Sequence, residues 1–200
     1  MTYATGTEGF SAVETKPEGL AVSYDLGTNS FEYDYGTYYI NGSNVYVYGT
    51  TDSRITLFNG GYGAAVNIDA TGSSGEARLA GDLNSNVISG GSYRNLLWGG
   101  WGFANDILVG GTGFNFFVSG QSEGSDTILN AGMYDTVYLR DVTVSDIIAT
   151  ASDGNTVGIL FNTGNVLTVT GTNAVSADFV LADDSRYWYD YSFQTWHQSS

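Results

Sequence analysis

The stretch GGSYRNLLWGGWGFANDILVGGTGFNFFV at residues 90–118 decides the fold. Three Gly-Gly pairs divide it into short segments, and each segment carries an apolar residue at a matching place: Leu97, Leu108 and Phe117. These residues are 11 and 9 positions apart. That interval is too short for a pair of helices and is typical of one short strand followed by one tight turn.

The same spacing extends in both directions along the chain. Apolar residues recur every 9 or 11 positions at Leu57, Ile68, Leu79, Ile88, Leu97, Leu108, Phe117, Ile128 and Val137. Two intervals make one coil of about 18–22 residues. The sequence therefore predicts an all-β fold, a right-handed parallel β-solenoid, in which stacked coils bury apolar faces that no strand buries alone.

Three regions are expected within one continuous domain. Residues 1–54 form Tyr-rich N-terminal strands or first coils, and residues 55–140 form the Gly-rich solenoid. Residues 141–200 form a C-terminal antiparallel cap, because turn residues such as Asp153-Gly154-Asn155 separate apolar segments there. A cap of this kind covers the open end of a stack of repeats.

Composition limits the possible partners. The chain carries 21 acidic and 6 basic residues, for a net charge of −15. This charge excludes binding to a nucleic-acid backbone and favours cations such as calcium, although acidity also serves to keep a protein soluble. Cys is absent, which removes disulfides and thiolate metal sites, and no segment is long and apolar enough to span a membrane.

The glycine-rich units resemble the Gly-Gly-x-Gly-x-Asp-x-apolar-x nonapeptide of the RTX (hemolysin-type) β-roll proteins. The resemblance is carried by residues 90–98, 99–109 and 110–118, with residues 120–132 similar to a degenerate closing repeat, and it covers about residues 80–190. It implies a calcium-binding β-roll and type I secretion, in which calcium outside the cell drives folding.

The residue two positions before each buried apolar residue is the candidate metal ligand. Glycine turns expose carbonyl oxygens, and a carboxylate at that position points back under the turn, which suits the oxygen coordination of calcium. Alternate turns share an edge, so one edge carries Val66, Asn86, Asp106 and Asp126, and the other carries Ala77, Asn95, Asn115 and Asp135.

Only the first edge places two carboxylates in successive turns. We therefore expect calcium between Asp106 and Asp126. Secondary candidates are Asn86, Asn95, Asn115 and Asp135. The alternative is a metal-independent solenoid, in which the Asn side chains form hydrogen-bonded ladders from coil to coil.

Aromatic residues beside the turns and near the C-terminus have three interpretations. Trp98, Trp101 and Trp188 would stack on sugar rings, pack against another subunit, or cover the ends of the coil within one chain. Catalysis is not expected, because His197 is the only histidine and is the fourth residue from the C-terminal end.

These features predict a non-catalytic module that is secreted or displayed on the cell surface. It would assemble with itself into filaments or a surface layer, or act as an adhesin in the extracellular matrix, with calcium as a stabilising cofactor. The alternative is a carbohydrate-binding or targeting module of a larger type I-secreted enzyme, with a surface glycan as its partner. A self-contained hydrolase or lyase is the third interpretation.

Overall fold

The structure is a computed structural model of the 200-residue chain. It describes residues 67–187 except 82, 101, 173–176 and 184. Before residue 67 and after residue 187 it describes the strands alone. Apart from η1 (Val144–Asp146), a single 3₁₀ turn, these residues contain no helix, so none that could cross a membrane.

The described strands form two ten-stranded sheets. Sheet A has the order β1 (Val13–Thr15), β4 (Thr37–Asn41), β5 (Asn44–Tyr48), β7 (Asn67–Asp69), β9 (Val87–Ser89), β11 (Ile107–Val109), β13 (Thr127–Leu129), β17 (Val166–Thr170), β16 (Thr156–Phe161) and β15 (Ile147–Ser152). Sheet B has the order β20 (Thr195–Gln198), β19 (Arg186–Asp190), β18 (Asp178–Leu181), β14 (Thr136–Leu139), β12 (Phe114–Ser119), β10 (Arg94–Trp98), β8 (Glu76–Ala80), β6 (Arg54–Phe58), β2 (Val22–Asp25) and β3 (Ser30–Tyr33).

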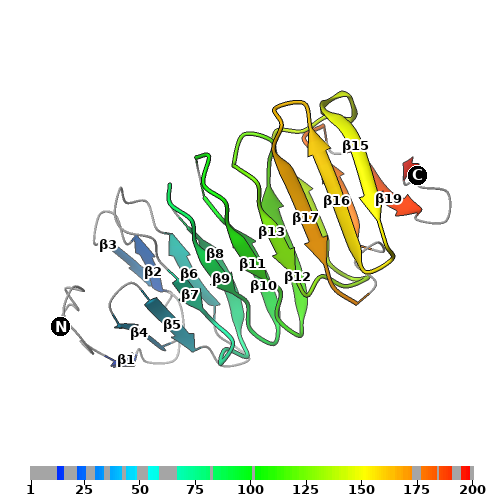
Figure 1. The fold of residues 1–200 in the computed structure, drawn as a ribbon. Helices are drawn as coiled ribbons and strands as arrows, with labels where there is room; N and C mark the ends of the chain where they lie inside the picture. The colour runs from blue at the N-terminus through cyan, green and yellow to red at the C-terminus, as the bar shows by residue number, and fades with distance from the viewer. Residues whose placement is uncertain are drawn as a thin grey trace.

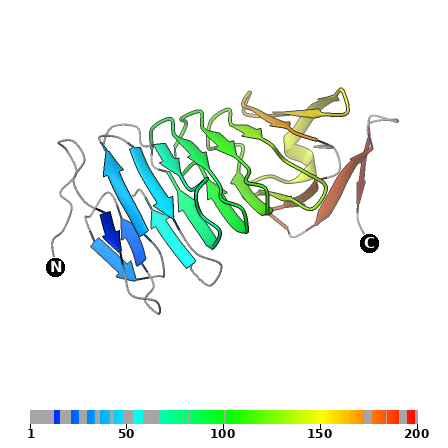
Figure 2. The same cartoon turned by 90° about the horizontal axis from the view of Figure 1, so that it is seen from below.

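From β5 to β14 the chain alternates between the two sheets, and the strands that meet within a sheet are parallel. This is the predicted β-solenoid. Figure 1 shows the strands lined up from the N-terminal to the C-terminal end, and Figure 2 shows the coils side by side from below. The register between β10 and β12 is 20 residues (Asn95 opposite Asn115), and the same offset joins β11 to β13.

The core is a double column of apolar side chains between the sheets. Each side chain has an exposed fraction of 0–1%, and each lies beside the corresponding side chain of the next coil, in the neighbouring strand of the same sheet. The column consists of Ile68, Ile88, Leu108, Ile128 and Val169 from sheet A, and Leu79, Leu97, Phe117, Val137 and Phe179 from sheet B. The apolar spacing is therefore confirmed from Ile68 to Val137, whereas the side chain of Leu57, in β6, lies outside the described residues.

Antiparallel strands occupy both ends of the stack. At the C-terminal end, β15 and β16 form a hairpin inserted before β17, and β19 and β20 follow β18. β17 and β18 themselves pair in parallel with β13 and β14, so the solenoid continues past residue 140. At the N-terminal end, β1–β4–β5 and β2–β3 are antiparallel.

Candidate functional site

The sequence-predicted ligand positions form two buried polar columns inside the solenoid. The first column contains Asn86, Asp106 and Asp126, and the second contains Asn95, Asn115 and Asp135. All six side chains have an exposed fraction of 4% or less. The alternation of the two edges is therefore as the sequence predicts.

In the first column, each carboxylate accepts the backbone N–H of the coil before it. The amide of Asn86 donates to Asp106 Oδ1 at 2.7 Å, and the amide of Asp106 donates to Asp126 Oδ1 at 3.0 Å. Asp126 Oδ2 accepts the Ser119 hydroxyl at 2.8 Å. Both oxygens of Asp126 are thus engaged by protein donors.

The second column is a ladder of side chains. Asn95 Nδ2 donates to Asn115 Oδ1 at 2.9 Å, and Asn115 Nδ2 donates to both carboxylate oxygens of Asp135 at 3.1 Å. The backbone N–H of Asn115 also donates to Asp135 Oδ1, at 2.8 Å. Each Asn also closes its own glycine turn, because Gly91 N and Gly111 N donate to Asn95 Oδ1 and Asn115 Oδ1 at 2.7 and 2.9 Å. These bonds link successive coils and satisfy polar groups that burial would otherwise leave unpaired.

The electrostatics of the columns bear on the calcium prediction. Burial raises the pKa of Asp126 to about 6, against the opposing effect of its bonds from the Asp106 amide and Ser119. Burial also raises the pKa of Asp135. Within the described ranges, no three acidic or histidine side chains converge as a metal-binding group. The hydrogen bonds between coils support the metal-independent ladder interpretation. Calcium between Asp106 and Asp126 stays a prediction.

A second candidate site lies on the outer face of sheet B. Every second residue of a strand points outward. The register places Trp98 beside Val118, Val118 beside Tyr138, and Tyr138 beside Val180 in one row across four strands. Leu96 and Phe116 stand together in the neighbouring row.

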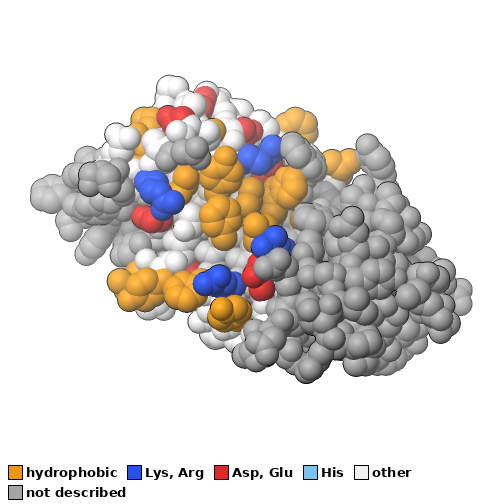
Figure 3. All heavy atoms as spheres, turned by 180° about the vertical axis from the view of Figure 1, so that it is seen from behind, with side chains coloured by type: hydrophobic (Ala, Val, Ile, Leu, Met, Phe, Trp, Pro, Cys, Tyr) orange, Lys and Arg blue, Asp and Glu red, His pale blue; other side chains and the backbone are white. Residues whose placement is uncertain are grey.

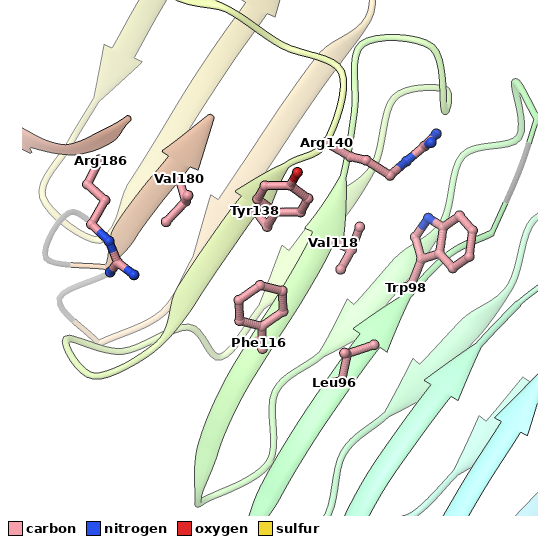
Figure 4. Close-up of a pocket in the computed structure, with 8 residues that line it drawn as sticks. All are labelled: Leu96, Trp98, Phe116, Val118, Tyr138, Arg140, Val180 and Arg186. Atoms are coloured by element: carbon pink, nitrogen blue, oxygen red, sulfur yellow. The ribbon is translucent and has the colours of Figure 1, made fainter. Parts of the chain in front are cut away.

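These side chains line an open groove of about 560 Å³, shown in Figure 4. The rings of Phe116 and Tyr138 lie 6.1 Å apart, inclined by 31°. The full lining is Leu96, Trp98, Phe116, Val118, Tyr138, Arg140, Val180 and Arg186. We call it the sheet-B groove. Its floor is apolar, with rings for stacking and a guanidinium group toward each end (Figure 4).

A buried carboxylate holds one side of the groove in place. Glu123, with 3% of its surface exposed, accepts the Trp98 indole N–H at 3.2 Å and the Arg140 Nε–H at 2.8 Å. The Arg140 guanidinium lies 5.6 Å from the centre of the Trp98 ring, within cation–π range. Burial raises the pKa of Glu123, and the charge of Arg140 opposes that effect. Trp98 is therefore fixed by contacts on its edge and its face.

Basic side chains surround the groove. Figure 3 shows hydrophobic side chains gathered on this side of the molecule with basic groups around them. Arg78 and Arg186 pair with Glu76 and Asp178 at 2.7 and 3.3 Å. Arg94 lies over the Tyr93 ring at 5.5 Å, and among the described residues no acidic side chain pairs with it.

The sequence left Trp98 with three interpretations, stacking on sugar, packing against another subunit or covering the coil within one chain, and it did not predict the groove. Val180 joins the row at an offset of 42 residues from Tyr138, whereas Trp98, Val118 and Tyr138 are neighbours through the 20-residue register. Reading outward positions at intervals of 20 would have found them. Trp101 and the side chains of Trp188 and His197 lie outside the described residues.

No protein-family model matches this sequence, and no curated protein matches it. The resemblance to the RTX repeats therefore stays a prediction, and the functional argument depends on the site itself.

Proposed function

We propose that this chain is a non-catalytic binding module, secreted or displayed on the cell surface, whose sheet-B groove holds a carbohydrate chain. The observation that carries the proposal is the groove itself, in which Trp98, Phe116 and Tyr138 surround an apolar floor beside the Arg140–Glu123 pair. Of the functions considered from the sequence, the carbohydrate-binding alternative is the one that this geometry favours.

The chemistry of the groove fits sugar rings. A pyranose presents an apolar face that stacks on an aromatic ring, and hydroxyl groups that need donors and acceptors at its rim. Arg140 supplies donors at this rim, and Glu123 orients both Arg140 and Trp98. Fixing these side chains in advance lowers the entropy that ligand binding would cost.

Replacing Trp98 tests the proposal. On a glycan array, we expect the wild-type chain to bind a defined set of glycans, and Trp98→Ala to lower the affinity for them about tenfold or more, as for a central aromatic contact. Phe103→Ala is the matched control, because Phe103 is 83% exposed and lies outside the groove, so its removal should leave binding unchanged. An array without hits, or equal loss in both variants, would refute the proposal.

Self-assembly, expected from the sequence, is the second candidate, and the edge of sheet A favours it. Among the described strands, β15 pairs on one side only, with β16, and its Ile148 is 60% exposed. An unpaired edge with an exposed apolar residue accepts a strand from another chain.

This candidate predicts oligomers or filaments of the wild-type chain by light scattering and electron microscopy, in chelator and in millimolar calcium. Ile148→Lys should return the chain to a monomer. Val166→Lys is the control, because Val166 is 38% exposed but its strand, β17, is paired on both sides. A monomeric wild-type chain in every condition contradicts self-assembly and leaves glycan binding intact.

Calcium stabilisation and type I secretion belong to the same extracellular proposal.

A further inference from the structure

We infer that the carbohydrate chain in the sheet-B groove is acidic and is recognised through its carboxylate groups. This inference rests on the proposed function and names the chemical class of the ligand. The net charge of −15 by itself favours cationic partners, so it does not predict an acidic ligand.

The arginines of this chain are concentrated on sheet B. The chain has five arginines, and four of them lie in strands of sheet B while the fifth, Arg140, directly follows β14. The four in strands are Arg54 in β6, Arg78 in β8, Arg94 in β10 and Arg186 in β19. The described strands of sheet A contain neither Arg nor Lys.

Screening by salt makes the charges near the groove matter more to a bound anion than the net charge of the chain. At physiological ionic strength, exposed charges interact over about 8 Å, so an anion on sheet B meets the nearby guanidinium groups and not the net charge of the chain. Among the side chains that the structure describes, the acidic partners on this face are Glu76, Glu123 and Asp178, each paired with one arginine. Sheet B also contains Asp25, Glu32 and Asp190, in β2, β3 and β19, and these side chains, like that of Arg54, lie outside the described residues. Arg94, held over Tyr93, adds a positive charge that no described carboxylate pairs with.

Two guanidinium groups line the groove itself. Arg140 stands beside Trp98, and Arg186 lies toward the other end (Figure 4). From β10 to β19 the groove crosses four strand spacings, or about 19 Å at ~4.8 Å each. That length accommodates several sugar rings, so a chain lying on the apolar floor would meet both arginines.

Arg186 retains donors for such a ligand. Its side chain is 56% exposed, and its hydrogen bond to Asp178 uses Nη1, at 3.3 Å. A guanidinium carries five N–H donors in a planar fork that matches a carboxylate. Arg186 is therefore the position where a carboxylate contact can be removed without disturbing the buried Glu123.

The test compares oligogalacturonate with its fully methyl-esterified form by isothermal titration calorimetry on the full chain. The two probes have the same sugar rings, but only the first carries carboxylates. We expect the acid to bind at least about tenfold more tightly, and added salt to weaken that binding. Arg186→Gln should lower the affinity for the acid about three- to five-fold and leave the ester unchanged. Arg78→Gln is the control of equal charge, because Arg78 faces the same side but does not line the groove.

Several outcomes would overturn the inference. Equal affinity for acid and ester refutes recognition of carboxylates while leaving glycan binding in place. Tighter binding of a sulfated chain than of oligogalacturonate assigns the arginines to another anion. A dimer in light scattering that Arg186→Gln dissociates would assign the face to a second copy of this chain. Absence of binding to both probes together with an empty glycan array refutes the proposed function itself.

Discussion

Gly111→Ala is expected to destabilise the protein by about 3 kcal/mol or more, the upper range for overpacking. A Cβ atom at this position would lie 1.7 Å from the backbone carbonyl oxygen of Gly91 in the preceding coil. Neither backbone can move away without separating the coils and breaking the bond from Asn95 Nδ2 to Asn115 Oδ1. Since whole proteins are stable by only 5–15 kcal/mol, the variant should lose much of its folded population.

Urea unfolding followed by circular dichroism measures this effect. Gly158→Ala is the matched control, because the nearest atom to its added Cβ would be the Ala151 carbonyl oxygen at 3.9 Å. That variant should stay within about 0.5 kcal/mol of the wild type. Equal unfolding midpoints for Gly111→Ala and Gly158→Ala would show that the coils do not stack as closely as described.

Asp126→Asn is expected to stabilise the protein at neutral pH, by up to about 3 kcal/mol. Burial raises the pKa of Asp126 from 3.8 to about 6, and each pKa unit corresponds to about 1.36 kcal/mol. The ionised carboxylate therefore weakens the folded state above pH 6. Asn keeps the oxygen that accepts the hydrogen bond from the Asp106 amide and removes the charge. Its Nδ2 replaces the oxygen that accepts the Ser119 hydroxyl, and can donate to that hydroxyl oxygen instead.

The pH dependence has a defined sign. Because the folded pKa lies above the unfolded one, the contribution of Asp126 to stability is complete below about pH 3.8 and is lost as the pH rises through about 6. Burial also raises the pKa of Glu123 and of Asp135. In chelator, the free energy of unfolding of the wild type should thus rise between pH 7 and pH 4, and Asp126→Asn should flatten that rise.

The same variant tests calcium. If calcium binds between Asp106 and Asp126, millimolar calcium should raise the melting temperature of the wild type, and Asp126→Asn should remove the increase. Magnesium is the control ion, because its strict octahedral geometry suits such carbonyl-rich turns poorly. A melting temperature that is the same in chelator and calcium would contradict the metal site and leave the hydrogen-bonded columns as the stabilising feature.

The fold was predictable because one spacing repeats. The interval from Leu97 to Leu108 to Phe117 fixed which residues are buried, and the residue two positions earlier fixed the polar columns. The roles of those polar residues were not predictable. The spacing of residues along the chain does not specify the backbone geometry between coils. It therefore does not show whether Asp126 binds an ion or accepts a hydrogen bond from the Asp106 amide.

The groove escaped prediction for a related reason. Trp98, Glu123 and Arg140 are 25 and 17 residues apart along the chain. They meet because Glu123, in the turn after β12, accepts hydrogen bonds from Trp98 at the end of β10 and from Arg140 after β14. Outward-facing residues also lack the strict apolar pattern of the core, since solvent accepts any side chain there. The sequence therefore predicted the buried columns, and the sheet-B groove was found only in the structure.

Amide hydrogen exchange on the full chain, with and without the glycan that binds best on the array, tests the central claim most directly. If the sheet-B groove holds the carbohydrate, binding should slow exchange in β10, β12 and β14 and leave β9, β11 and β13 of sheet A unchanged. Slower exchange confined to sheet A or to the terminal strands, with β10, β12 and β14 unaffected, would contradict the account.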